Sequence, residues 1–263
     1  VISVSCTHRR AHQLDLKLSS STRMADQIVD GKPAACDRES SMTLSNGIVL
    51  RIGHSAKDAI KMEGLAKHHN GGWTGCSIWN SAESLAKILS AEPERIQGKR
   101  VIEVGAGCGL VGLVAGAMGA RDVTLTDEVV FMLDHNVDTN FCKYPDLHQR
   151  FKVNKLRWGN KDDLAALEPP YDVIIGSDIL YFDAVLHLLV DTLVALSGPG
   201  THILIAGPDN LPHQRHSQGF YSQLQTGGIE VVDVLADGPR AKKLKLDLDS
   251  DRGEVNVIEM IKT

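Results

Sequence analysis

The sequence predicts an α/β fold in which helices cover both faces of a seven-stranded, mostly parallel sheet. From residue 100 onward, short apolar runs typical of buried strands alternate with apolar residues at helical spacing. Such alternation is typical of parallel sheets, because each connection between parallel strands carries a helix across one face. The last two apolar runs, 229–234 and 255–261, lack a helix between them, which predicts one antiparallel strand at the end of the sheet.

The expected elements follow one another in regular order. Before the final pair, the expected strands are short apolar runs at 101–104, 123–126, 151–158, 171–177 and 202–206. The expected helices have apolar residues at a helical spacing and lie at 78–89, 110–118, 129–141, 184–196 and around 220–225. Asn80 or Ser81 is placed to cap the first of these helices.

The N-terminal part is expected to be a tail followed by a hairpin. Residues 1–40 are polar without sustained periodicity, so we expect a largely disordered tail. Two apolar runs within 42–52 flank Asn46-Gly47, a dipeptide typical of tight turns between antiparallel strands. We therefore expect one domain over 41–263 that opens with a hairpin, followed by a loop or short helix at 53–72.

Composition and charge narrow the possible function classes. The net charge of −5 gives no basic field, which argues against general nucleic-acid binding. The five cysteines are scattered and no zinc-binding spacing occurs, so we expect free thiols and no metal site. No apolar run reaches the roughly 18 residues that cross a bilayer. We expect a monomer in the cytoplasm, or also in the nucleus, without nucleic-acid or membrane partners.

A glycine-rich turn is the most informative motif. The strand at 101–104 leads into Gly105, Gly107 and Gly109, which let the backbone turn sharply and let a ligand approach without a Cβ in the way. The N-terminus of the following helix offers free N–H groups. The GxGxG spacing is typical of S-adenosylmethionine (SAM) sites, whereas a dinucleotide site would have glycine at Leu110. A tight turn without a ligand is the alternative interpretation.

Two acidic residues extend this motif. Glu103, near the end of the first strand, would attract the ammonium of a methionyl group and would repel a pyrophosphate. Asp127 follows the next strand, roughly 20 residues beyond the glycines, where a carboxylate can accept hydrogen bonds from both ribose hydroxyls. Its alternative role is to cap the following helix. Together these residues predict a SAM site on a Rossmann-like, doubly wound sheet.

Two further strand ends are expected at the same edge, because ligands of open α/β sheets bind outside the carboxyl ends of the strands. Trp158 ends the third strand, where it could stack on adenine or fill the core. Ser177 and Asp178 end the fourth strand, and Tyr181 follows three residues later. A carboxylate and a phenol there can position an amine by hydrogen bonds. The alternative is an Asp178 that caps a helix beside a packed Tyr181.

At this point the sequence resembles the family-16 protein methyltransferases, a seven-β-strand group that contains many protein lysine methyltransferases. The likeness extends over roughly residues 42–263, and Asp178 with Tyr181 matches the DxxY motif of the family. The family often has Asp where this chain has Asn80 or Arg157. Besides the hairpin, four pieces account for the likeness: Thr74-Gly75 with Ile78–Ala82, Val101–Leu110, Leu156–Gly159 and Tyr171–Tyr181.

The resemblance implies roles for individual residues. Trp79 would line the methionyl end of SAM, and Trp158 would lie by the adenine. Asp178 and Tyr181 would face the substrate nitrogen and form the catalytic pair. The expected cofactor-binding set is Trp79, Glu103, Gly105, Gly107, Gly109, Asp127, Trp158 and Ser177.

We therefore expect a SAM-dependent N-methyltransferase that methylates a lysine side chain of a protein substrate and releases S-adenosylhomocysteine. A small-molecule N-methyltransferase or a protein histidine methyltransferase on the same fold is the alternative. A SAM-binding scaffold without catalytic activity is a second alternative, although the acidic residues argue against it. An NAD(P)-binding oxidoreductase is disfavoured by Leu110.

Overall fold

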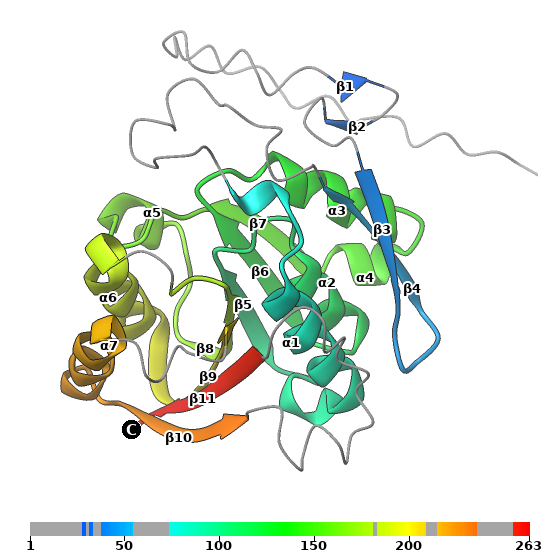
Figure 1. The fold of residues 1–263 in the computed structure, drawn as a ribbon. Helices are drawn as coiled ribbons and strands as arrows, with labels where there is room; N and C mark the ends of the chain where they lie inside the picture. The colour runs from blue at the N-terminus through cyan, green and yellow to red at the C-terminus, as the bar shows by residue number, and fades with distance from the viewer. Residues whose placement is uncertain are drawn as a thin grey trace, which may run out of the picture.

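Seven strands form one sheet in the computed structural model, which describes residues 28–29, 32–33, 38–54, 74–180, 183–208, 215–235 and 255–263. Helices lie on both faces of this sheet, so the expected Rossmann-like fold class is confirmed (Figure 1). The sheet has the order β10-β11-β9-β8-β5-β6-β7. Its strands are β5 (Arg100–Val104), β6 (Asp122–Asp127), β7 (Phe151–Lys155), β8 (Tyr171–Ser177), β9 (Ser197–Pro208), β10 (Ile229–Leu235) and β11 (Val255–Lys262).

The direction of the strands places a crevice in the middle of the sheet. Strands β5 to β9 are parallel, whereas β11 lies antiparallel between β9 and β10, as expected from the two final runs. From β5 the chain moves outward through β6 to β7 and then returns to β8 on the other side of β5. This reversal is the switch point at which ligands bind in open α/β sheets. The residues that follow β5 and β8 are therefore the first candidates for a site.

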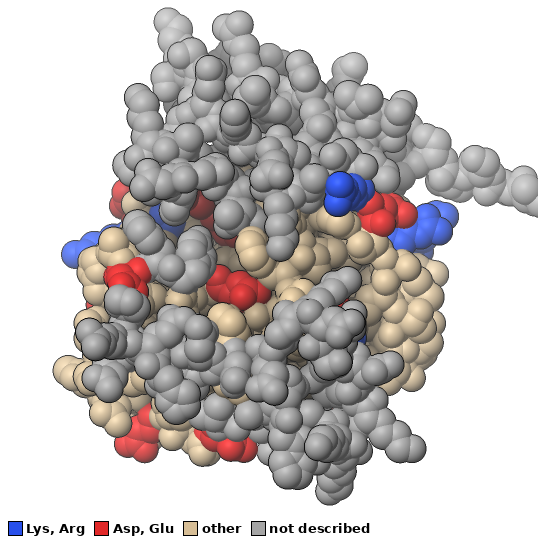
Figure 2. Space-filling model, viewed as in Figure 1, with Lys and Arg blue, Asp and Glu red and all other residues tan. Residues whose placement is uncertain are grey.

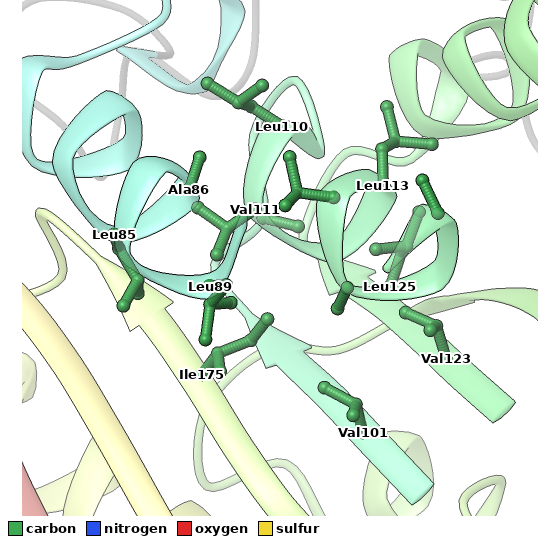
Figure 3. Close-up of a cluster of buried hydrophobic side chains, with 14 of the residues drawn as sticks. Leu85, Ala86, Leu89, Val101, Leu110, Val111, Leu113, Val123, Leu125 and Ile175 are labelled. Carbon is green, nitrogen blue, oxygen red and sulfur yellow. The ribbon is translucent and has the colours of Figure 1, made fainter. Parts of the chain in front are cut away.

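Two apolar clusters bury the two faces of the sheet. Alternate residues along β5 point to opposite faces, so Val101 belongs to one cluster and Ile102 to the other. The first cluster packs Leu85, Leu89 and Leu113 against the sheet (Figure 3). The longer helices are α1 (Asn80–Ala91), α2 (Leu110–Ala117), α3 (Phe131–Phe141), α6 (Leu186–Leu196) and α7 (Arg215–Thr226).

Short helical turns fill several connections. None of the described helices is long and apolar enough to cross a membrane. The short α-helices are α4 (Pro145–His148) and α5 (Lys161–Ala165). The 3₁₀ turns are η2 (Thr74–Cys76), η3 (Pro93–Arg95) and η4 (Asp183–Val185).

An N-terminal hairpin lies beside α3 and consists of β3 (Arg38–Thr43) and β4 (Val49–His54). Gly47 in its turn has φ of 84°, as an Asn-Gly turn requires, so the expected hairpin is confirmed. Strand β3 begins inside the expected tail, because its exposed polar residues give no apolar signal. The strands β1 (Ile28–Val29) and β2 (Lys32–Pro33) also pair. The rest of the expected tail, and most of 53–72, lie outside the described residues.

Two sequence-based details were wrong. The third strand ends at Lys155 rather than at residue 158, because the backbone N–H of Arg157 donates to the Asp163 carboxylate instead of to a strand. Neither Asn80 nor Ser81 caps α1: the helix has Trp79 at its N-cap and no side-chain capping bond there. The hydroxyl of Ser81 is used elsewhere, as the geometry of the candidate site shows.

Candidate functional site

Three chain segments meet at the carboxyl edge of the sheet: the loop after β5, the end of β6 and the turn after β8. The N–H of Gly107 donates to Asp127 Oδ2 at 2.8 Å, which joins the first segment to the second. A Cβ placed on Gly105 would lie 2.8 Å from Ile179 Cγ2, so the third segment also contacts the loop. The expected convergence of these strand ends is therefore present in the structure.

The glycine loop has a backbone that glycine alone adopts without strain. Gly105, Gly107 and Gly109 have φ of 65°, 55° and 80°, a region that penalises residues with a Cβ. Space is also limited, because a Cβ on Gly107 would lie 2.7 Å from the carbonyl oxygen of Gly75. The Cys108 thiol donates to the same oxygen at 3.4 Å. The Thr74-Gly75 segment thus packs directly against the loop.

Glu103 is buried beneath the first turn of α2, with only 1% of its surface exposed. Its Oε2 accepts a hydrogen bond from the N–H of Gly112 at 2.8 Å. The pKa of Glu103 is raised to about 8, mainly by burial and also by the nearby Asp127, while the Gly112 N–H opposes the shift. In this arrangement Glu103 satisfies a free N–H at the start of α2. Its role toward a methionyl ammonium stays a prediction.

Asp127 holds the glycine loop with one oxygen and its own turn with the other. Its Oδ2 accepts from Gly107, and its Oδ1 accepts from the N–H of Val129 at 3.1 Å. The N-cap of α3 is Val130, so Asp127 does not cap that helix. The capping alternative is therefore excluded by the geometry, and the ribose-binding role stays a prediction.

Two tryptophans flank these segments. A Cβ on Gly105 would lie 3.3 Å from Trp158 Cζ2, so the half-buried indole covers the first glycine of the loop. Trp158 also packs against the apolar cluster on its side of the sheet, so it fills part of the core, and its stacking on adenine stays a prediction. Trp79 is 36% exposed at the N-cap of α1. Both positions are compatible with contacts to a ligand at the switch point.

Asp178 has a strained backbone and a side-chain link to α1. Its φ is 53°, the one positive value among the described residues other than glycine; such strain costs of order 1–3 kcal/mol and is concentrated at functional sites. The hydroxyl of Ser81 donates to Asp178 Oδ1 at 2.9 Å. The N–H of Asp178 donates to the carbonyl oxygen of Ala206 at 2.9 Å. No helix begins at Asp178, since η4 starts at Asp183, so its helix-cap alternative is excluded.

Of the two remaining predicted site residues, the structure describes Ser177 but not Tyr181. Ser177 is half-buried at the end of β8, where it pairs with Ala206 of β9. Tyr181 lies outside the described residues, so its pairing with Asp178 stays a prediction. Ser81 is the residue that the sequence reasoning missed, although it lies beside Trp79 in one of the four matching pieces. Its polar side chain on the buried face of α1 was the available signal.

The arrangement fits a ligand such as SAM. Glycines without side chains line the turn, an indole covers Gly105, and the N-terminus of α2 follows directly. Asp127 adds a carboxylate within reach of the same loop. Within the described ranges, no group of three or more His, Cys, Asp or Glu side chains could hold a metal ion. The glycine loop, the indole and the carboxylate thus fit SAM at the switch point, and their roles toward it stay predictions.

Solved structures share the fold. One neighbour is a Streptococcus mutans protein classed as a SAM-dependent methyltransferase, with a TM-score of 0.53 and 15% identity over 85% of this chain and 55% of that chain. Another is SMU.776, classed as a methyltransferase and solved with S-adenosylhomocysteine, with a TM-score of 0.52 and 13% identity over 88% and 57% of the two chains. At such low identity these likenesses show the fold alone.

Sequence relatives are more similar. Protein N-lysine methyltransferase METTL21A is 39% identical in Danio rerio, over 49% of this chain and 58% of the relative, and 37% identical in Xenopus tropicalis, over 61% and 71%. EEF1A lysine methyltransferase 3 of Mus musculus is 35% identical, over 52% and 56%. The matches thus span between about half and about three quarters of these relatives. A model of the family described as lysine methyltransferase (Methyltransf_16) matches residues 60–226. This chain therefore belongs to the lysine methyltransferase family.

Proposed function

We propose that this chain is a SAM-dependent N-methyltransferase that methylates a lysine side chain of a protein substrate. The observation that supports this most directly is the contact between the glycine loop after β5 and the turn that holds Asp178 after β8. The two segments follow paired strands, which supports a role for the loop in cofactor binding and for Asp178 in substrate binding. Membership of the lysine methyltransferase family supports the same activity.

The proposed cofactor contacts come from this same edge of the sheet. When bound, SAM supplies a methyl group that is activated by attachment to a sulfonium. Asp127 would accept hydrogen bonds from the ribose, and Trp158 would cover the adenine. Trp79 and Ser177 would line the methionyl end, and Glu103 would act on its ammonium from beneath α2.

Asp178 would bind and orient the substrate amine. A lysine in water has a pKa of about 10.4, so the amine must lose a proton before its lone pair can attack. Partial burial favours the neutral amine, whereas a carboxylate favours the ammonium. We therefore assign Asp178 to binding and orientation, with Tyr181 as its expected partner. Ser81 acts as a positioning residue, because its hydroxyl fixes Asp178 Oδ1 at 2.9 Å. Correct placement of the reacting groups supplies most of the expected acceleration.

A protein substrate is favoured by the named relatives and by the charge of the surface. The relatives include a calmodulin-lysine N-methyltransferase of Arabidopsis thaliana as well as METTL21A and EEF1A lysine methyltransferase 3. On the face shown in Figure 2, one group of acidic side chains lies near the centre, and further acidic side chains lie toward the margins, as do lysine and arginine side chains. An acidic centre suits a cationic lysine better than an anionic metabolite.

The proposed setting is the cytoplasm, or also the nucleus, with the chain acting as a monomer. The five cysteines are scattered along the sequence without paired spacing, as suits a reducing compartment. The net charge of −5 gives no general attraction to nucleic acids, so none is expected as a partner.

Transfer of radiolabelled methyl from SAM into a cell lysate tests the proposal. The native chain should label one or a few protein bands, and Asp178→Ala should lose that label while it still binds S-adenosylhomocysteine. Hydrolysis of a labelled band should give methyllysine; methylhistidine would favour the histidine enzyme. Label confined to small molecules would favour a metabolite enzyme, and binding without any label would favour a scaffold.

A further inference from the structure

Asn136 of α3 joins three segments that lie far apart in the sequence. Its side chain is fully buried, with 0% exposed surface. The amide nitrogen donates to the carbonyl oxygen of Cys108 at 2.8 Å and to that of Gly53 at 3.0 Å. The amide oxygen accepts from the N–H of Gly53 at 2.8 Å. Both N–H donors and the acceptor of this amide are therefore used, one of them on the glycine loop.

Asn140, one helical turn later, makes an equivalent contact with the hairpin. Its amide donates to the carbonyl oxygen of Arg51 and accepts from the N–H of Arg51, both at 2.7 Å. Arg51 and Gly53 are two residues apart, so their backbone groups face the same side of β4. Four helical residues rise about 6 Å and two strand residues about 6.7 Å, so the two spacings match. The two asparagines thus occupy the place of a neighbouring strand.

The two asparagines differ in what they touch beyond β4. Asn140 also donates to the backbone oxygen of Asn136 at 2.7 Å, within its own helix. Asn136 alone of the two reaches the glycine loop, where Cys108 lies between two glycines with positive φ. On the other side of that peptide, the N–H of Gly109 donates to the carbonyl oxygen of Ala106 at 2.7 Å. The Cys108–Gly109 peptide is therefore fixed at both its oxygen and its nitrogen.

We propose that Asn136 is a positioning residue that links the Gly53 backbone of β4 to the shape of the glycine loop, and through it to cofactor affinity. The proposal rests on the proposed function, since the ligand is the SAM of that site. Gly109 directly after this peptide, and Gly107 just before Cys108, make the segment easy to rotate. A buried hydrogen bond from Asn136 selects one orientation before the ligand arrives. Preorganisation of this kind raises affinity, because the loop is already ordered and loses little conformational entropy when the ligand binds.

A calorimetric titration of the full chain with S-adenosylhomocysteine tests this coupling. We expect Asn136→Ala to weaken binding about tenfold, as loss of one buried hydrogen bond on the loop would do. Asn140→Ala is the matched control: it removes the same kind of hydrogen bonds to β4 without touching the loop, so its affinity should change less than twofold. Equal affinities of the two variants would overturn the proposal. No binding by the native chain would contradict the proposed function instead.

Removal of a buried amide can also prevent folding, so a second measurement uses the native protein. Hydrogen exchange of individual amides is followed by NMR with and without saturating S-adenosylhomocysteine. Coupling is reciprocal, so the ligand should slow exchange of the Gly53 N–H, which donates to Asn136, by up to about tenfold. The Arg51 N–H, which donates to Asn140, should change much less. Equal slowing at both amides, or none at Gly53, would contradict the coupling.

Discussion

The hydroxyl of Ser81 donates to Asp178 Oδ1 at 2.9 Å and joins two residues 97 positions apart in the chain. Ser81 lies in the first turn of α1, and Asp178 follows β8. A helix that packs on one face of the sheet thereby holds a side chain at its carboxyl edge. The strained backbone of Asp178 sets the direction of that side chain, and Ser81 fixes one of its oxygens.

Ser81→Ala should lower methyl transfer without weakening cofactor binding. It removes one donor to a carboxylate, and such bonds contribute about 1.5–3 kcal/mol. We expect a decrease of roughly tenfold or more in kcat for labelled methyl transfer. The affinity for S-adenosylhomocysteine should stay within about twofold of the native value. Ser84→Ala, another buried serine on the same helix, is the control and should keep its kcat. The positioning role fails if both variants lose the same activity.

The strained backbone at Asp178 should lower the free energy of unfolding of the native chain. The φ of 53° at this residue is tolerated by glycine and penalises alanine. Asp178→Gly should therefore have a free energy of unfolding about 1 kcal/mol above that of Asp178→Ala, while both lose methyl transfer. Urea unfolding of the two variants measures this difference. A glycine variant less stable than the alanine variant would show that the backbone strain is not significant.

The sequence could predict the sheet but not the links between its distant parts. Asp178 was correctly placed at the edge of the sheet, because the apolar run of β8 ends directly before it. The bonds from Ser81 to Asp178 and from Asn136 to Gly53 and Cys108 connect segments far apart in the sequence. Local periodicity carries no information about such pairs. Ser81 therefore resembled a helix cap, and Asn136 resembled an ordinary polar residue of a helix.

Glu103 should make the protein less stable as the pH rises toward 8. Burial raises its pKa from 4.5 to about 8, so between these values the folded protein holds a proton that the unfolded chain has lost. The stability that this bound proton contributes is complete below about pH 4.5 and is lost as the pH rises through about 8. The expected slope in this window is roughly −1.4 kcal/mol per pH unit. Urea unfolding between pH 5 and about 8 measures it.

Glu103→Gln is the control for this pH dependence. A glutamine keeps an oxygen that can accept from Gly112 but does not titrate. Its stability should therefore be much flatter across the same window than that of the native chain. If both proteins show the same slope, Glu103 is not the group responsible. A methionyl ammonium near Glu103 would favour its charged form, so saturating SAM should reduce the slope of the native chain.

Gly105→Ala should damage both the fold and the ligand site, for two separable reasons. Its φ of 65° penalises any Cβ, and that Cβ would also lie 2.8 Å from Ile179 Cγ2 and 3.3 Å from Trp158 Cζ2. Gly47→Ala is the matched control, because Gly47 has φ of 84° but no atom within 4 Å of the added Cβ. Strain alone should cost Gly47→Ala about 1 kcal/mol, whereas Gly105→Ala should lose about 2–4 kcal/mol.

The affinity for the ligand should also differ between the two glycine variants. The methyl group added at Gly105 points at the indole proposed to cover the adenine, so affinity for S-adenosylhomocysteine should fall at least about tenfold. Gly47 lies in the hairpin turn, and its variant should bind within about twofold of the native chain. Calorimetric titration below the unfolding temperature of each variant separates affinity from stability. Native affinity in Gly105→Ala would place the ligand away from the glycine loop, and would remove the basis for assigning Trp158 to the adenine.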